Sequence, residues 1–105
     1  MSYQLIFSQA ARDDLRRLFD FLLERELSSP TGDPTLPDRA IEAIERACEF
    51  LRHSPFSCRK VAANPFMREL LISFGHSGYV ALFEIQDERR VIVGAVRHQR
   101  ESDYH

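Results

Sequence analysis

The sequence predicts one α+β domain spanning residues 1–105: an N-terminal strand, an antiparallel helical hairpin and a three-stranded antiparallel meander. Three observations predict this fold class. The first half holds two segments whose apolar residues recur at helical spacing. The second half holds three short apolar or alternating segments separated by brief turns. The length, with 44 % hydrophobic and 29 % charged residues, is that of a single globular domain.

The chain opens with a strand and a helix. Side chains alternate from Tyr3 to Phe7, which predicts a short strand. Ser8 is a suitable N-cap, because its hydroxyl can accept a hydrogen bond from an amide of the first helical turn. Apolar residues at helical spacing continue this helix to near Glu26 or Leu27.

A proline-rich loop and a second helix complete the hairpin. The segment Ser28–Pro37 contains three prolines and a glycine, so it cannot continue the first helix. A second amphipathic helix is predicted from about Asp38 to Arg52. Neither helix can bury its apolar stripe alone, so both need a sheet. Six of their side chains are expected to be buried against it: Leu18, Phe19, Leu22, Ile41, Ile44 and Leu51.

The second half supplies the sheet. Strands are predicted at Arg68–Phe74, Tyr79–Ile85 and Val91–Arg97, with turns at Gly75–Gly78 and Gln86–Arg89. Such short connections favour an antiparallel meander. Helices then cover one face of the sheet, and the other face remains available for function.

Composition excludes several classes of protein. No apolar run approaches the roughly 20 residues that span a bilayer, and the first residues lack the features of a signal peptide. A cytoplasmic protein with no membrane contact is therefore expected. Cys48 lies on a helical apolar stripe and Cys58 in a loop, so a disulfide framework is not indicated. A catalytic pair of a cysteine with His53 or His98 remains an alternative.

Neither a metal nor a cofactor is expected. The side chains His53, Cys58, His76 and His98 do not show metal-ligand spacing. Nothing resembles a glycine loop that cradles phosphate.

The basic residues are unevenly distributed. The net charge is −2, yet no acidic residue lies between Glu49 and Glu69. Arginine suits contacts with carboxylates and phosphates. The alternative is an ordinary solvated surface. The basic residues of this stretch are Arg52, His53, Arg59, Lys60 and Arg68.

Element order and local sequence together resemble the RelE/ParE toxin superfamily. The opening Phe7–Leu15 looks like the family's strand, serine cap and alanine-rich first turn. Arg68–Leu70 and Gly78–Phe83 resemble its central strands, and Ala95–Tyr104 resembles its last strand and tail. The resemblance implies a growth-inhibiting toxin, often linked to plasmid stabilisation, that a cognate antitoxin neutralises in a hetero-oligomer. It also implies two targets: members similar to ParE block DNA gyrase, and members similar to RelE cut messenger RNA, usually on the ribosome.

The two targets need different residues. Metal-free RNA cleavage requires an acid, a base and cations for the phosphate. His98 is the candidate base or acid, because imidazole changes charge near neutral pH, and Tyr104 is a candidate acid or stacking platform. The structural alternatives are a surface histidine and arginines paired with nearby acids. The candidate target- or phosphate-binding residues are Arg59, Lys60, Arg68, Arg97 and Arg100.

The overall charge favours a protein target. Ribonuclease members typically carry many lysines, whereas this chain has the single lysine Lys60 and a pI of about 6.1. DNA gyrase is therefore the leading expectation, which favours a binding protein over an enzyme; an enzymatic toxin would be an endoribonuclease. The alternatives are an mRNA endoribonuclease and a non-toxic binding module of the same fold.

Overall fold

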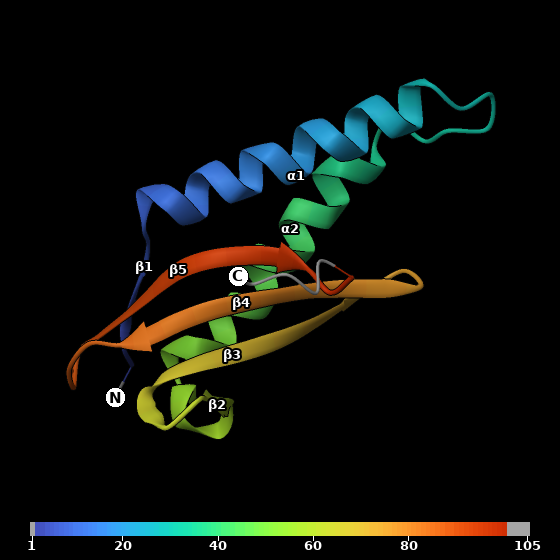
Figure 1. The fold of residues 1–105 in the computed structure, drawn as a ribbon. Helices are drawn as coiled ribbons and strands as arrows, with labels where there is room; N and C mark the ends of the chain where they lie inside the picture. The colour runs from blue at the N-terminus through green and yellow to red at the C-terminus, as the bar shows by residue number, and fades with distance from the viewer. Residues whose placement is uncertain (1, 101–105) are drawn as a thin grey trace.

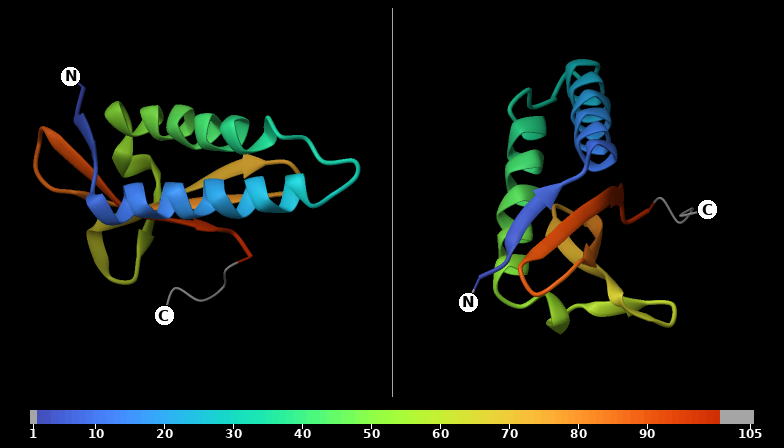
Figure 2. Two further views of the ribbon diagram at one scale, coloured as in Figure 1. Left: turned by 90° about the horizontal axis from the view of Figure 1, so that it is seen from above. Right: turned by 90° about the vertical axis from the view of Figure 1, so that its left-hand side faces the viewer.

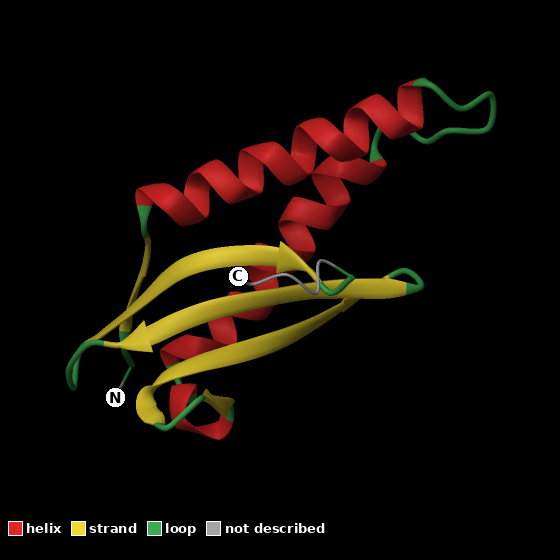
Figure 3. Cartoon of the chain, viewed as in Figure 1, coloured by secondary structure: helices red, strands yellow, loops and turns green. Residues whose placement is uncertain are grey.

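The protein forms two layers, a helical hairpin packed on one face of a five-stranded sheet (Figures 1 and 3). The computed structural model describes residues 2–100. None of the helices in this range is long and apolar enough to cross a membrane. The elements in order are β1 (Gln4–Phe7), α1 (Gln9–Leu27), α2 (Leu36–Cys48), the 3-10 turns η1 (Glu49–Arg52) and η2 (Pro55–Ser57), β2 (Arg59–Val61), β3 (Asn64–Phe74), β4 (Ser77–Ile85) and β5 (Arg90–His98).

The strand order in the sheet is β1-β5-β4-β3-β2. The predicted meander is confirmed as the antiparallel strands β3, β4 and β5. β1 pairs parallel to β5, so the first and last strands are neighbours. The predicted helical hairpin is also confirmed, and Figure 2 shows α1 and α2 side by side over the sheet.

Some predicted boundaries were wrong. The second helix begins at Leu36, before the predicted Asp38, because proline fits the first turn of a helix. It ends at Cys48, and residues 49–52 tighten into a 3-10 turn. β3 begins at Asn64, four residues before Arg68, and includes Pro65. Its antiparallel pairing with the unpredicted strand β2 shifts register between Lys60 and Val61, and such a bulge tolerates a proline.

Four of the six predicted core side chains are fully buried. Leu18, Leu22, Ile44 and Leu51 are at most 4 % exposed and lie in one cluster with the inward side chains of the sheet. Phe19 and Ile41 are only half-buried. Both lie at the margin of their stripes, where an amphipathic helix turns from the core toward solvent.

The second half of β5 lacks a strand neighbour on its outer side. β1 covers β5 only as far as Val93. Ser8 then turns the chain, with its amide donating to the Val93 carbonyl at 2.9 Å and its hydroxyl capping α1 through the Ala11 amide. From there α1 runs past the uncovered part of β5, whose backbone groups still need partners.

Asp14 on α1 supplies the partner of one of these groups, the Val96 amide. Its Oδ2 atom accepts the Val96 amide at 2.9 Å and the Arg97 guanidinium at 2.5 Å. Its Oδ1 atom accepts Arg17 at 2.9 Å. Asp14 is 5 % exposed and is the buried charged residue of the described chain. The carboxylate therefore replaces a missing strand and ties α1 to the sheet.

The β2–β3 hairpin turns through Ala62 and Ala63, and Ala62 has a positive φ of 55°. A positive φ at only the first turn residue is the pattern of a type II′ hairpin, in which glycine is usual at that position. An L-residue there is strained by roughly 1–2 kcal/mol.

We expect Asp14→Ala to lower the free energy of unfolding by about 3 kcal/mol, because it leaves Arg97 without its counter-charge and the Val96 amide without an acceptor. Asp14→Asn should lose less, since an amide oxygen can still accept from Val96. Asp13→Ala is the matched control, because Asp13 is exposed and should change stability by less than about 0.5 kcal/mol. Denaturant titration measures all three, and equal losses at positions 13 and 14 would contradict the role of Asp14.

Ala62→Gly should raise the free energy of unfolding by about 0.5–1 kcal/mol, because glycine removes the strain but costs backbone entropy. Ala63→Gly is the control with the opposite expected sign, since the φ of Ala63 is not positive. Thermal melts of both variants test the turn, and stabilisation by Ala63→Gly alone would refute it.

Candidate functional site

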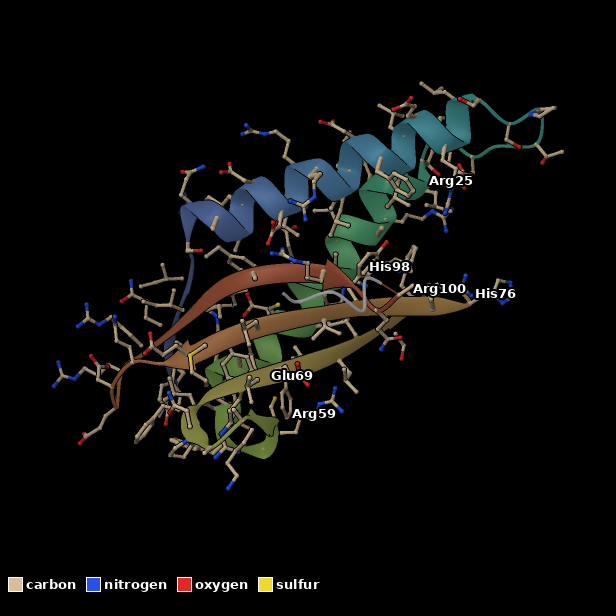
Figure 4. All side chains as sticks on the ribbon, viewed as in Figure 1. Arg25, Arg59, Glu69, His76, His98 and Arg100 are labelled. Atoms are coloured by element: carbon tan, nitrogen blue, oxygen red, sulfur yellow. The ribbon has the colours of Figure 1, made fainter. Side chains whose placement is uncertain are left out.

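A groove of about 740 Å³ lies between the distal half of α1, the start of α2, the β3–β4 turn and the end of β5. Its apolar lining includes Leu18, Leu22, Phe74 and Tyr79, together with Phe21, which is 62 % exposed. Figure 4 shows the labelled basic side chains of this region toward the tip of the β3–β4 hairpin. The basic lining residues are Arg17, Arg25, His76, His98 and Arg100.

The groove is electrostatically one-sided. Every charged residue that lines it within residues 2–100 is basic. Arg17 and Arg25 pair with Asp14 and Glu26 but keep side chains that are 55 % exposed. Burial raises the pKa of the Tyr79 phenol above its ordinary value, against the opposing effect of Arg25, so the hydroxyl stays protonated at neutral pH. The groove therefore suits a ligand with both apolar and acidic groups.

His98 closes one wall of the groove and is bonded on both ring nitrogens. Its Nδ1 accepts the Arg100 amide at 3.0 Å, and its Nε2 lies 2.9 Å from the Ser77 hydroxyl. Because Nδ1 acts as an acceptor, Nε2 of the neutral ring carries the hydrogen and donates a hydrogen bond to the Ser77 hydroxyl oxygen. The ring also packs edge-on against Tyr79, with centroids 5.4 Å apart. In this arrangement neither nitrogen is left to take a proton from a substrate.

Arg97 and His98 face different partners, as alternation along a strand predicts. Arg97 contacts Asp14, and its side chain is 31 % exposed. The guanidinium also bonds the Val96 carbonyl at 3.2 Å. The structure thus places Arg97 in the joint between α1 and β5.

Arg68 lies at the other end of β3 and holds the chain segment before β2. Its Nε donates to the Pro65 carbonyl at 2.7 Å, and its Nη1 donates to the carbonyls of Phe56 and Cys58 at 2.9 and 2.7 Å. The guanidinium carbon also lies 5.1 Å from the centroid of the Phe56 ring, within cation–π range. Arg68 is thus bound to three carbonyls and one aromatic face.

The remaining predicted site residues are dispersed. Arg59 pairs with Glu69 at 2.5 Å across β2 and β3. The Lys60 side chain makes no hydrogen bond or ion pair with residues 2–100, and the same is true of the Arg100 side chain. Tyr104 lies outside the described residues. The five predicted basic residues therefore fall into two groups: Arg59, Lys60 and Arg68 on the paired strands β2 and β3, and Arg97 and Arg100 at the end of β5.

Neither cysteine has the environment of a nucleophile. Cys48 is fully buried, and burial raises the pKa of its thiol to about 12, with smaller contributions from Glu45 and Glu49. Burial also raises the pKa of Cys58, although Arg68 opposes the shift. A thiol that stays protonated is a poor nucleophile, so the alternative of a catalytic cysteine–histidine pair is not supported. Within residues 2–100, no three His, Cys, Asp or Glu side chains gather as a metal ligand set would.

Sequence analysis missed Asp14, Phe21, Phe56 and Phe66. Asp14 could have been found, because it shares the helical stripe of Ala11 and Leu18. Phe21 lies on the polar arc of α1, where an exposed aromatic is a signal in its own right. Phe56 and Phe66 lie in segments without periodicity, so only the structure brings them together.

Comparison with known sequences identifies the family. Residues 5–103 match the family model described as the ParE toxin of the type II toxin–antitoxin system parDE. The chain is 37 % identical to Toxin RelE3 of Caulobacter vibrioides over 92 residues, which cover 87 % of this chain and 88 % of that protein. It is 32 % identical to Toxin RelE1 of the same organism over 81 % and 82 % of the two chains.

Solved structures agree on the fold. A chain from the chromosomal ParDE system of P. aeruginosa superposes with a TM-score of 0.69 at 13 % identity, covering 92 % of this chain and 96 % of that chain. A chain from the toxin–antitoxin complex RelBE2 of Mycobacterium tuberculosis gives a TM-score of 0.62 at 21 % identity, covering 94 % and 100 %. The protein belongs to the ParE toxin family within the RelE/ParE superfamily and is the toxin of a type II toxin–antitoxin system.

Proposed function

We propose that this toxin stops growth by binding a protein, with DNA gyrase as its target, and that it does not cut RNA. The observation that carries the proposal is that the candidate catalytic residue His98 and the candidate phosphate-binding residues Arg68 and Arg97 are bonded to internal partners. Arg97 is held by Asp14, Arg68 by three carbonyls, and both ring nitrogens of His98 are bonded. Cleavage of RNA needs such groups to be available for the phosphate and for proton transfer.

The two predicted cations without side-chain partners in residues 2–100 lie too far apart for one phosphate. Lys60 is on β2, and Arg100 follows β5. Strands β3 and β4 lie between β2 and β5, so the two strands are about 14 Å apart across the sheet. Along the sheet, Lys60 is in register with Arg68 and Phe83, whereas His98 is in register with Tyr79. That offset of four residues adds about 13 Å in the perpendicular direction.

A cognate antitoxin is the second part of the proposal. Structural relatives of this chain come from toxin–antitoxin complexes. We infer that the antitoxin places a segment with apolar and acidic side chains in the groove beside α1. The exposed ring of Phe21 and the one-sided basic charge of the lining support this assignment.

The choice of target is tested with purified toxin in two assays, supercoiling by gyrase and cleavage of ribosome-bound mRNA. We expect the wild type to inhibit supercoiling, and His98→Ala, shown by its melting curve to be folded, to retain that inhibition. If His98 were the acid or base of a ribonuclease, the same change would reduce cleavage by about 10²–10⁴-fold. A toxin that cuts mRNA and leaves supercoiling untouched would overturn the proposed target.

The groove is tested through antitoxin affinity. Phe21→Ser and Arg25→Glu should each weaken antitoxin binding by roughly tenfold or more, as for other interface anchors, while growth arrest in the absence of antitoxin persists. Leu27→Ser and Arg16→Glu are matched controls, since both residues are exposed on α1 and neither lines the groove. Titration calorimetry measures the affinities. Equal losses in the test and control variants would exclude the groove as the antitoxin site.

A further inference from the structure

We propose that the β2–β3 end of the molecule carries a second interaction surface, an aromatic knob, that docks on an acidic surface of the target protein. We define the aromatic knob as Phe56, Phe66, Arg68 and Lys60. This inference rests on the proposed function, because it assumes that the target is a protein.

The two phenylalanines are exposed but held rigidly. Phe56 is 48 % and Phe66 is 51 % exposed, and their rings meet edge to face with centroids 6.3 Å apart. Phe56 follows the buried Pro55 in η2, and the Phe66 amide donates to the Asn64 side chain at 2.9 Å. An exposed and preordered aromatic pair contributes little to the core, but loses little entropy when a partner covers it.

Arg68 supports this pair from below. Its guanidinium lies against the Phe56 ring, and its carbonyl bonds tie η2 to the start of β3. The two segments that carry the rings are therefore cross-linked by one side chain. Aromatic residues and arginine are also the residue types that are enriched at the centres of protein interfaces.

The charge around the knob specifies an acidic partner. No acidic residue occurs between Glu49 and Glu69 in the sequence. Glu69 pairs with Arg59, and strand alternation places both Glu69 and the exposed Glu84 on the sheet face opposite to Arg68 and Lys60. Complementary charge both attracts such a partner and orients it.

A protein fits the knob better than single-stranded nucleic acid. Bases stack on open aromatic faces, but Arg68 covers one face of Phe56, and Phe66 packs against the same ring. Binding of a nucleic acid backbone also needs several available cations. Arg68 and Arg59 are already bonded, which leaves Lys60 as the cation of the knob without a partner in residues 2–100.

The knob and the groove lie at opposite ends of β3. Phe66 is near the start of this strand, and Phe74, which lines the groove, is its last residue. Eight residues of extended chain separate them, or about 26 Å. In Figure 4 the labelled Arg59 lies on the β2 side of the sheet, and the labelled His76 lies at the β3–β4 turn. Changes at one surface should therefore leave binding at the other intact.

The test measures gyrase inhibition and antitoxin affinity for the same set of full-length variants. Phe66→Ser and Lys60→Glu should each raise the toxin concentration needed for half-inhibition of supercoiling by about tenfold or more, with antitoxin affinity unchanged. Leu27→Ser and Arg16→Glu, which likewise replace an exposed apolar residue by serine and a cation by glutamate but on α1, should leave both readouts unchanged. Retained antitoxin affinity shows that a variant is folded.

Wild-type inhibition by the Phe66 and Lys60 variants, or equal losses in the α1 controls, would overturn the knob while the gyrase assignment stands. If the wild type arrests growth without inhibiting gyrase, growth arrest becomes the readout. Relief of arrest by the knob variants alone, with no RNA cleavage by the wild type, would then support the knob and remove the named target. RNA cleavage by the wild type that Lys60→Glu abolishes would identify a nucleic acid partner and overturn the proposal.

Discussion

The fold depends on how the edge of β5 is satisfied beyond the end of β1. β1 covers only the first part of β5, and the backbone beyond Val93 meets a helix where another strand would continue the sheet. The Asp14 carboxylate accepts the Val96 amide there and pairs with Arg97, so a single side chain both satisfies one backbone donor of the edge and balances a partly buried charge. This contact fixes the position of α1 along the sheet. Its distal half then overhangs the β3–β4 turn, and the overhang forms one wall of the groove.

Two arginines act as internal cross-links in this toxin. Arg97 joins a helix to a strand, and Arg68 joins a 3-10 turn to a strand through backbone carbonyls. A planar guanidinium with several donors suits both tasks, which a lysine could not perform with the same geometry. The surfaces without an internal role are marked instead by exposed aromatic side chains, Phe21 at one end and the Phe56–Phe66 pair at the other. The two surfaces proposed for recognition thus share exposed rings beside positive charge.

Periodicity explains why so much of the fold could be predicted. The helices α1 and α2 and the meander carry long repeating patterns, and the buried positions Leu18, Leu22, Ile44 and Leu51 follow from them. β2 has three residues, too few for a pattern, and its partner strand contains a proline that argues against pairing. The site was harder to predict, because the type of a residue indicates which hydrogen bonds its side chain can form but not which ones it forms in the fold. The partners of Arg68 are backbone carbonyls, which no pattern of side chains reveals.

The parallel pairing of the first and last strands has a consequence for how the chain assembles. Ser8 and Gly94 are bonded across a separation of 86 residues, and closing such a loop costs entropy that local hairpins do not. The strands of the meander can pair with near neighbours, whereas β1 has no partner until β5 has been synthesised. The position of α1 depends on the same late step, because Asp14 on α1 bonds to Val96 and Arg97 on β5. A nascent chain therefore cannot bring α1 and β5 together as walls of the groove before β5 has left the ribosome.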